Sequence, residues 1–400
     1  MPHICIEHLI KIYGSPSHHA LTLFRNGADR DTILEKTGQV LGVADVSFEI
    51  HPGEIFVVMG LSGSGKSTLV RCINRLIKPT SGHIYIDGED IVRFNERQLQ
   101  QLRLNQVSMV FQNFGLFPHK TVAENVGYGL RIKGVNKQQR RQKALETLDV
   151  VGLSQWADYL PTSLSGGMQQ RVGLARALVT DANILLMDEP FSALDPLIRR
   201  TMQDELLRLQ QTLNKTIVFI SHDIQEALRI GDRIAIMKDG YIVQIGTPEA
   251  LITQPANEYV GAFIQDVNRA QVLKTGGITR QVQVCQLGQD SPKTVWKQMQ
   301  HQDYMYVVDQ DRKPVGLLER NRLESFLQKD ETDLAHIMHT NFSTVSDNIL
   351  LEKIFHYFQS GLPLAVTNHA NQFQGIIETR DLVASLADTP IHSHLQDKTS

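Results

Sequence analysis

A glycine-rich loop near residue 60 has the composition of a phosphate-binding loop. Gly60 to Thr68 reads G-L-S-G-S-G-K-S-T, after an apolar run that ends at Met59 and before a helix-like run. Glycines let the backbone curl so that N–H groups point at phosphate oxygens, and a helix N-terminus adds partial positive charge. We expect a nucleoside triphosphate to bind here; the alternative is a Gly/Ser-rich surface loop. The expected contact residues are Gly60, Ser62, Gly63, Ser64, Gly65, Lys66, Ser67 and Thr68, with the hydroxyl of Ser67 also binding Mg²⁺.

Two adjacent acids follow a second apolar run. Asp188 and Glu189 come directly after Ile184–Met187. Open α/β sheets bind ligands at the carboxyl ends of their strands, so both carboxylates are expected at the site. Asp188 would hold Mg²⁺ through water, and Glu189 would act as the general base that polarises the attacking water. The alternative is a pair of exposed acids that only caps a strand.

A third motif brings in a family resemblance. Leu164-Ser165-Gly166-Gly167-Met168-Gln169 precedes the Asp188 strand, and together with the loop and the acid pair it resembles the signature of ABC-type ATPases. The resemblance implies ATP and Mg²⁺ as cofactors and a homodimer in which the signature of one subunit contacts the γ-phosphate held by the other. It assigns ATP contacts to Ser165, Gly166, Gly167 and Asp195, and catalytic roles to Gln112 (also a Mg²⁺ ligand) and His222.

Tyr13 stands where this family places the aromatic ring that stacks on adenine. A polar, helix-like insert over residues 15–40 separates it from the next strand. A core or loop tyrosine is therefore the rival interpretation.

The order of apolar runs predicts an α/β fold. Strand-like and helical segments alternate over the first 265 residues, and a hairpin is expected to turn at Asp239 and Gly240. The resemblance implies a P-loop NTPase cassette with a RecA-like α/β core, an antiparallel β subdomain and a helical subdomain at about 95–165. We expect this domain to span residues 1–266, followed by a linker over 267–279.

The C-terminal region contains a weak repeat. Val307 aligns with Val366, and Gly316 aligns with Gly375, each copy reading strand, turn, strand, helix. With the insert, this layout resembles the glycine betaine/proline (osmoprotectant) importer ATPases of the ProV type. In them the repeat is a tandem CBS (α+β) module, which implies CBS 1 over 280–331, CBS 2 over 332–389 and a disordered tail over 390–400.

The two copies differ at the positions that contact nucleotides in adenosyl-binding CBS modules. The second copy keeps Gly375 and Asp381 but has Glu378 in place of a hydroxyl residue, and the first copy has Glu319 and Arg322. A glutamate there would repel a phosphate. Structural, ionic-strength and cyclic-dinucleotide roles all stay open.

Composition narrows the class of protein further. The chain has 400 residues, a net charge of −3 and three separated cysteines, so nothing global indicates nucleic acid or a disulfide framework. We expect neither a signal peptide nor a transmembrane segment. The expected location is the cytoplasmic face of the inner (plasma) membrane, as a peripheral subunit.

The resemblance implies partners and leaves rivals. It implies two copies of a transmembrane permease subunit and a periplasmic or lipid-anchored substrate-binding protein. The apolar residues Phe114, Leu116, Phe117 and Pro118 could form the permease dock, and the basic run 133–143 could be either a solvated helix face or a contact with anionic lipid. The rival functions are an importer ATPase for another small solute, such as an amino acid, and a soluble non-transport ABC ATPase.

Overall fold

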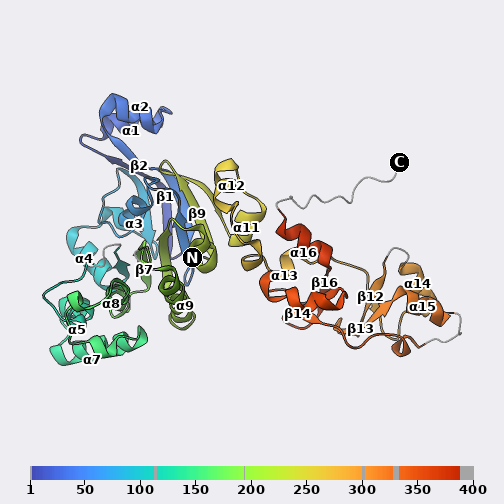
Figure 1. Cartoon of the computed structure of the whole chain (residues 1–400). Coiled ribbons are helices and arrows are strands. Elements are labelled where there is room, and N and C mark those ends of the chain that lie inside the picture. The colour runs from blue at the N-terminus through green and yellow to red at the C-terminus, as the bar shows by residue number, and fades with distance from the viewer. Residues whose placement is uncertain (1, 112–114, 193, 300–301, 328–332, 388–400) are drawn as a thin grey trace. The chain divides into compact units, whose positions relative to one another are not determined.

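The fold divides into two units. A computed structural model describes residues 2–111, 115–192, 194–299, 302–327 and 333–387, and contacts group the chain into Met1–Val267 and Asn268–Ser400 (Figure 1). No helix among these residues is long and apolar enough to cross a membrane. Gln112, Phe114 and the expected tail over 390–400 lie outside the described residues.

A six-stranded sheet forms the centre of the first unit. Its order is β10-β9-β3-β8-β7-β6, with β10 antiparallel to β9 and the other neighbours parallel. The strands are β3 (Ile55–Met59), β6 (Val107–Val110), β7 (Ile184–Asp188), β8 (Thr216–Ser221), β9 (Arg233–Lys238) and β10 (Tyr241–Gly246). Every residue of β3, β7 and β8 is buried, which explains why these strands are apolar on both faces.

A second, antiparallel sheet packs against the first. Its order is β2-β1-β4-β5, with β1 (Ile4–Tyr13), β2 (Val40–Ile50), β4 (Ser81–Ile86) and β5 (Glu89–Asp90). One hydrophobic core joins both sheets, and Phe48 stacks on Phe56 at 4.9 Å between ring centroids. The sheet therefore fixes Tyr13, the last residue of β1, relative to β3.

Helices connect and follow the strands of the first unit. They are α3 (Lys66–Ile73), α4 (Glu96–Asn105), α5 (Val122–Val126), α6 (Tyr128–Ile132), α7 (Lys137–Val150), α8 (Gly166–Leu178), α9 (Pro196–Leu213), α10 (Ile224–Ile230), α11 (Pro248–Thr253) and α12 (Glu258–Ile264). The expected helical subdomain at about 95–165 includes α4 and β6. These two elements belong to the sheet layer instead, because Leu99, Leu102 and Val107 are part of its core.

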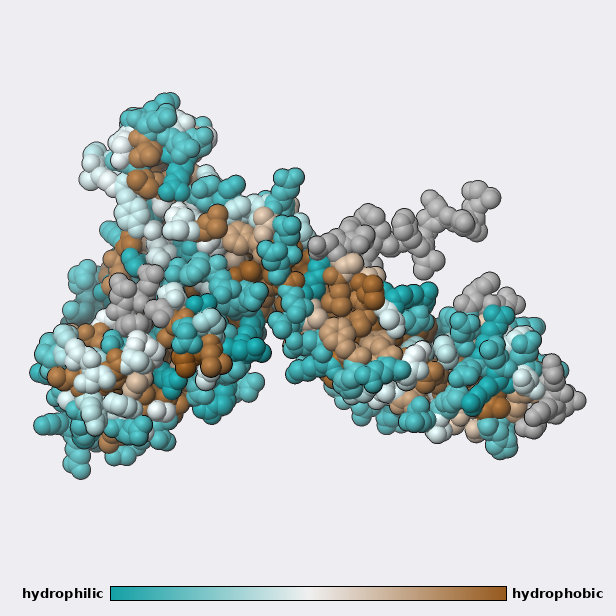
Figure 2. Space-filling view, in the orientation of Figure 1, coloured by the Kyte–Doolittle hydropathy of each residue, from teal (hydrophilic) through white to brown (hydrophobic). Residues whose placement is uncertain are grey.

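The expected insert forms two short helices, α1 (His18–Arg25) and α2 (Arg30–Thr37). They share a small core with β1 and β2, in which Ala20 and Ile33 are fully buried. On the face shown in Figure 2, the outer surface of this insert is mostly hydrophilic. The insert is therefore a packed part of the first unit.

The second unit contains two similar halves. One pairs β11 (Cys285–Gln286), β12 (Tyr304–Val308) and β13 (Pro314–Glu319) with α14 (Pro292–Gln298) and α15 (Arg320–Leu327); the other pairs β14 (Thr344–Ser346), β15 (Leu364–Thr367) and β16 (Phe373–Ile377) with α16 (Thr379–Leu386). Val307 opposes Gly316 and Val366 opposes Gly375 in the strand registers. The predicted strand, turn, strand, helix repeat is confirmed.

Residues expected to form a linker are structured. The segment over 267–279 contains the short helices η4 (Arg269–Gln271) and α13 (Thr275–Ile278). Thr275 is fully buried, its N–H donates to the carbonyl of Ile349, and its hydroxyl donates to that of Ser346. Residues 268–279 differ from the expectation because they belong to the second unit, where the backbone of Thr275 and Gly276 is paired with Ile349 and Asp347.

Candidate nucleotide-hydrolysis site

The phosphate loop requires glycine at two close approaches. Gly60 has φ +148°, and a Cβ there would lie 2.2 Å from the carbonyl oxygen of Met237. Gly65 has φ +103°, and a Cβ there would lie 2.2 Å from the carbonyl oxygen of Gly42. No other residue fits either place, so the glycines let the loop run against β9 and β2.

Lys66 lies inside the curl of this loop. Its Nζ donates to the carbonyl oxygens of Gly60 at 2.8 Å and Leu61 at 3.0 Å. Burial lowers the pKa of Lys66, while the carboxylates of Glu189 and Asp188 act in the opposite direction. The ammonium of Lys66 is thus held by the carbonyl groups at the start of the loop, and the negative charges of Glu189 and Asp188 favour its protonated form.

Ser67, Asp188 and Arg71 form a polar cluster at the start of α3. The Ser67 hydroxyl donates to Oδ1 of Asp188 at 2.9 Å, and Nη2 of Arg71 lies 3.1 Å from Oδ2. The Asp188 side chain is 1% exposed. A hydroxyl and a carboxylate are the oxygen donors that Mg²⁺ prefers, so Ser67 and Asp188 fit the expected metal.

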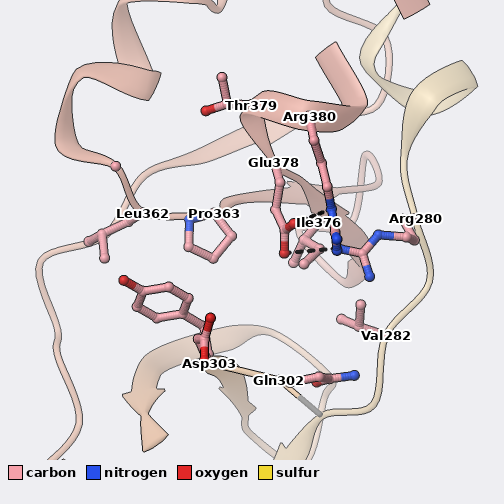
Figure 3. A pocket seen from close by; sticks show the side chains of 12 residues that line it. Arg280, Val282, Gln302, Asp303, Leu362, Pro363, Ile376, Glu378, Thr379 and Arg380 are labelled. Carbon is pink, nitrogen blue, oxygen red and sulfur yellow. Dashed lines mark ion pairs between the residues drawn. The ribbon is translucent and has the colours of Figure 1, made fainter. Parts of the chain in front are cut away.

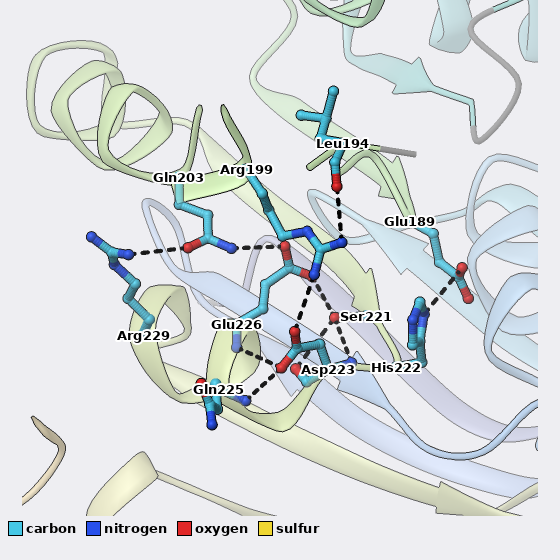
Figure 4. A network of polar contacts seen from close by, with 10 residues as sticks. All are labelled: Glu189, Leu194, Arg199, Gln203, Ser221, His222, Asp223, Gln225, Glu226 and Arg229. Carbon is cyan, nitrogen blue, oxygen red and sulfur yellow. Dashed lines mark hydrogen bonds and ion pairs between the residues drawn. The ribbon is translucent and has the colours of Figure 1, made fainter. Parts of the chain in front are cut away.

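Glu189 and His222 face each other across the ends of two neighbouring strands. Nδ1 of His222 lies 3.3 Å from Oε2 of Glu189, with the side chains 58% and 18% exposed (Figure 4). Glu189 has φ +48°, an unusual value for a residue with a side chain. The structure thus brings the two expected catalytic side chains together, at the edge where Asp188 and the phosphate loop also meet.

A polar network that the sequence did not predict lies behind this pair. Arg199 donates through Nη2 to the carbonyl oxygen of Leu194 at 3.1 Å and through Nη1 to Asp223 at 3.4 Å (Figure 4). This arginine ties the segment before Asp195 to the residue after His222.

The buried centre of the network is Glu226. It accepts hydrogen bonds from the Ser221 hydroxyl and from Nε2 of Gln203, the latter at 3.0 Å. Burial raises the pKa of Glu226, and these two hydrogen bonds oppose the shift. The network joins β8, α9 and α10 into one support for the histidine.

The signature residues lie on the surface at a helix start. Ser165 caps α8, accepting from the N–H of Met168 at 3.4 Å, and both Ser165 and Gly166 are exposed. A Cβ at Gly167 would lie 3.2 Å from Leu194, so the signature adjoins the segment that leads to Asp195. Asp195 is also exposed and caps α9, accepting from Ile198 N–H at 3.1 Å.

Tyr13 lies beside the phosphate loop and is not a core residue. Its hydroxyl is 3.0 Å from Oγ1 of Thr68, and the residue is 38% exposed. A Cβ at Gly42 would lie 2.9 Å from the ring, so glycine leaves room for it. Part of the Tyr13 side chain is therefore exposed to solvent, with Nζ of Lys11 5.1 Å from the ring centroid.

The second unit has its own polar pocket, with a cavity of about 370 Å³ (Figure 3). Nη2 of Arg280 lies 2.9 Å from Oε1 of Glu378, and Nε of Arg380 lies 2.7 Å from Oε2 of the same carboxylate. Nε of Arg280 is also 3.7 Å from Asp381. Glu378, which replaces the expected hydroxyl residue, therefore engages both guanidinium groups of the pocket.

Comparisons with known proteins cover both units. Residues 43–192 match the ABC transporter family model, and residues 334–388 match the CBS domain model. The chain is 48% identical over 387 residues to the glycine betaine transport ATP-binding protein OpuAA of Bacillus subtilis, covering 96% of this chain and 92% of that protein. It is 45% identical to the glycine betaine/carnitine transport ATP-binding protein GbuA of Listeria monocytogenes, covering 98% and 99%.

Solved structures match about three fifths of the chain. The dimeric structure of MJ0796, a bacterial ABC transporter cassette, has a TM-score of 0.53 and 33% identity, and covers 61% of this chain and 98% of that one. A post-hydrolysis state of the same cassette, bound to ADP and Pi, matches equally well. The likeness thus extends to a cassette that has been seen as a dimer and with hydrolysis products.

Proposed function

Because this chain belongs to the ABC transporter ATP-binding proteins, within the group that contains OpuAA and GbuA, we propose that it hydrolyses ATP to power uptake of glycine betaine or a related quaternary amine. The observation that carries the hydrolytic part is the convergence of Lys66, Ser67 and Asp188 with the Glu189–His222 pair at one sheet edge. The solute is carried over from what the relatives' names say.

Each side chain of the site has a distinct task in this proposal. The phosphate loop and Lys66 bind the phosphates, and Tyr13 stacks on adenine. Ser67 and Gln112 would hold Mg²⁺ directly and Asp188 would hold it through water, and the metal would neutralise charge on the phosphates. Glu189 accepts a proton from the attacking water while His222, 3.3 Å away, keeps the carboxylate oriented.

The site is completed by a second copy of the chain. Ser165, Gly166 and Asp195 are exposed, so they are free to face the phosphate loop of a partner subunit. We propose a homodimer that encloses ATP at its interface, joined to two permease subunits and a substrate-binding protein at the cytoplasmic face of the membrane. ATP binding then favours the closed dimer, and hydrolysis removes the contacts that hold it closed.

The second unit is proposed to regulate this cycle. An anionic ligand entering the pocket of Figure 3 would compete with the Glu378 carboxylate for Arg280 and Arg380. This competition lowers the affinity of the pocket for the ligand, while the cavity itself stays open.

The test is ATP hydrolysis in vesicles that contain the co-purified membrane subunits, with solutes supplied through the binding protein. We expect glycine betaine to stimulate hydrolysis more than amino acids do. Stimulation by an amino acid alone would support the rival importer. Failure to co-purify any membrane subunit, with solute-independent hydrolysis, would support a non-transport ATPase.

A further inference from the structure

The insert between β1 and β2 contacts the phosphate loop directly. Nη1 of Arg30, the first residue of α2, donates to the carbonyl oxygen of Gly63 at 3.3 Å. The same nitrogen lies 3.6 Å from Oδ1 of Asp239, and the Arg30 side chain is 34% exposed. A segment that looked like a peripheral addition in the sequence therefore reaches the nucleotide site.

Packing holds this arginine in place. Ile33 of α2 is fully buried, in the core that the insert shares with β1 and β2. Asp29 caps α2 by accepting from the N–H of Thr32 at 2.9 Å, and the hydrogen bonds from Thr32 lower the pKa of this carboxyl group. The backbone of Arg30 is thus fixed between a helix cap and a buried anchor.

The neighbouring hairpin makes the matching contact. The N–H of Gly240, at the turn between β9 and β10, donates to the carbonyl oxygen of Ser64 at 3.0 Å. The insert also packs against this hairpin, because the ring centroids of Phe24 and Tyr241 are 6.3 Å apart. Two consecutive loop carbonyls, of Gly63 and Ser64, are therefore held from outside the loop.

Fixing these carbonyls sets the direction of the loop amides. In a trans peptide, C=O and N–H point in opposite directions, so a carbonyl held on one side turns the next residue's N–H to the other side. The amides set in this way are those of Ser64 and Gly65. The N–H of Ser64 donates to the carbonyl oxygen of Leu61 at 3.2 Å, so the contact on the Gly63 carbonyl supports a turn inside the loop, and the contact on the Ser64 carbonyl orients the N–H of Gly65. A loop that is held in this shape before nucleotide arrives needs less ordering on binding.

We propose that Arg30 is a positioning residue for nucleotide binding. It holds the Gly63 carbonyl and keeps a positive charge beside the loop, so that the insert belongs to the ATP site. This inference rests on the proposed ATPase function. It assigns Arg30 an effect on nucleotide affinity and none on the chemical step, because its guanidinium acts through the loop backbone.

The experiment measures MgADP binding by titration calorimetry on the full chain, since ADP is not hydrolysed. We expect Arg30→Gln to raise the dissociation constant roughly twofold to fivefold, the range of partly exposed charge contacts. Arg30→Lys, which keeps the charge but not the planar fork, should fall between Arg30→Gln and the unmodified protein. Lys36→Gln removes the other cation of α2, an exposed one, and should leave the affinity unchanged.

A second readout separates positioning from folding. The thermal midpoint of Arg30→Gln should match that of Lys36→Gln, and kcat at saturating ATP should match that of the unmodified protein while KM rises. Equal MgADP affinity in Arg30→Gln and the unmodified protein would overturn the inference, as would an equal loss in Lys36→Gln. Absence of MgADP binding to the unmodified protein would instead overturn the ATPase function, and the inference with it.

Discussion

Glu189 combines three features that a general base needs. It follows a buried strand, its carboxylate is mostly shielded, and it lies 3.3 Å from His222. Its left-handed backbone, φ +48°, turns the side chain differently from that of Asp188 directly before it. Adjacent carboxylates in one short segment thereby face different partners, Ser67 for one and His222 for the other.

Replacing Glu189 by Gln should separate binding from hydrolysis. The amide keeps the size of the side chain but cannot accept the proton of the attacking water, so we expect turnover to fall by about a hundredfold or more. ATP affinity should be retained, because the phosphate loop is untouched. Steady-state phosphate release and nucleotide titration measure the two effects.

The matched control is Glu146→Gln on the exposed face of α7, where Glu146 accepts a hydrogen bond from Gln142. This variant makes the same chemical change at an exposed residue outside the candidate site, so turnover should stay unaltered. Near-normal hydrolysis by Glu189→Gln would remove Glu189 from the role of base.

Local sequence patterns predicted that Asp188 and Glu189 stand at the end of a buried strand, and the structure places both there. The two acids could be placed because they follow the carboxyl end of a strand in a parallel sheet, which is where open α/β folds bind ligands. Arg30 and Arg199 could not, because each acts through a backbone carbonyl distant in the sequence, of Gly63 and Leu194 respectively. Every residue carries a backbone carbonyl, so a contact of this kind leaves no recognisable motif in the sequence.

At the scale of elements, the residue that caps the start of α8 has two tasks. Ser165 caps the helix through a long hydrogen bond to Met168 N–H, at 3.4 Å, and its exposure leaves the hydroxyl accessible to a partner subunit. Capping is a local task that aspartate performs about as well as serine. Donation to a phosphate is a task that aspartate cannot perform.

Ser165→Asp should therefore preserve the fold and abolish the activity. We expect an unchanged thermal midpoint, because the cap is kept, and a large loss of hydrolysis, because a carboxylate repels the γ-phosphate. Thermal unfolding and phosphate release check the two parts. Ser291→Asp changes the equivalent cap of α14 in the second unit and should alter neither. Full activity in Ser165→Asp would mean that Ser165 only caps the helix.

Element boundaries show where periodicity is informative and where it fails. The hairpin at Asp239 and Gly240 was predicted correctly, because both residues adopt the positive φ that such turns need, +51° and +89°. The placement of α4 was not, since its Leu99 and Leu102 look the same in sequence whether they face the sheet or other helices. The spacing of apolar residues predicts which face of a helix is buried. Only the tertiary contacts show which element that face packs against.

At the scale of the whole molecule, the two units have separate cores. Truncation after Val267 should keep ATP hydrolysis, because the core beneath the site lies wholly in the first unit. If the second unit senses ionic strength, we expect hydrolysis in the assembled transporter to respond to salt with the full-length chain and to lose that response with the truncated chain. The control truncation removes residues 388–400 alone and should keep that response. An unchanged response after truncation at Val267 would exclude an ionic-strength role.

The dimer can be tested by mixing two inactive chains. Lys66→Ala removes the phosphate contact, and Ser165→Asp removes the signature contact. In a homodimer of either variant, both sites carry the same defect, so neither site can hydrolyse ATP. In a mixed dimer, the intact loop of the Ser165→Asp chain meets the intact signature of the Lys66→Ala chain, which restores one complete site. We expect hydrolysis to reappear on mixing, measured as phosphate release at constant total protein. If each site were built within one chain, mixing would restore no activity, because every chain carries one defect. Activity that stays at the level of the separate variants would therefore contradict the shared site.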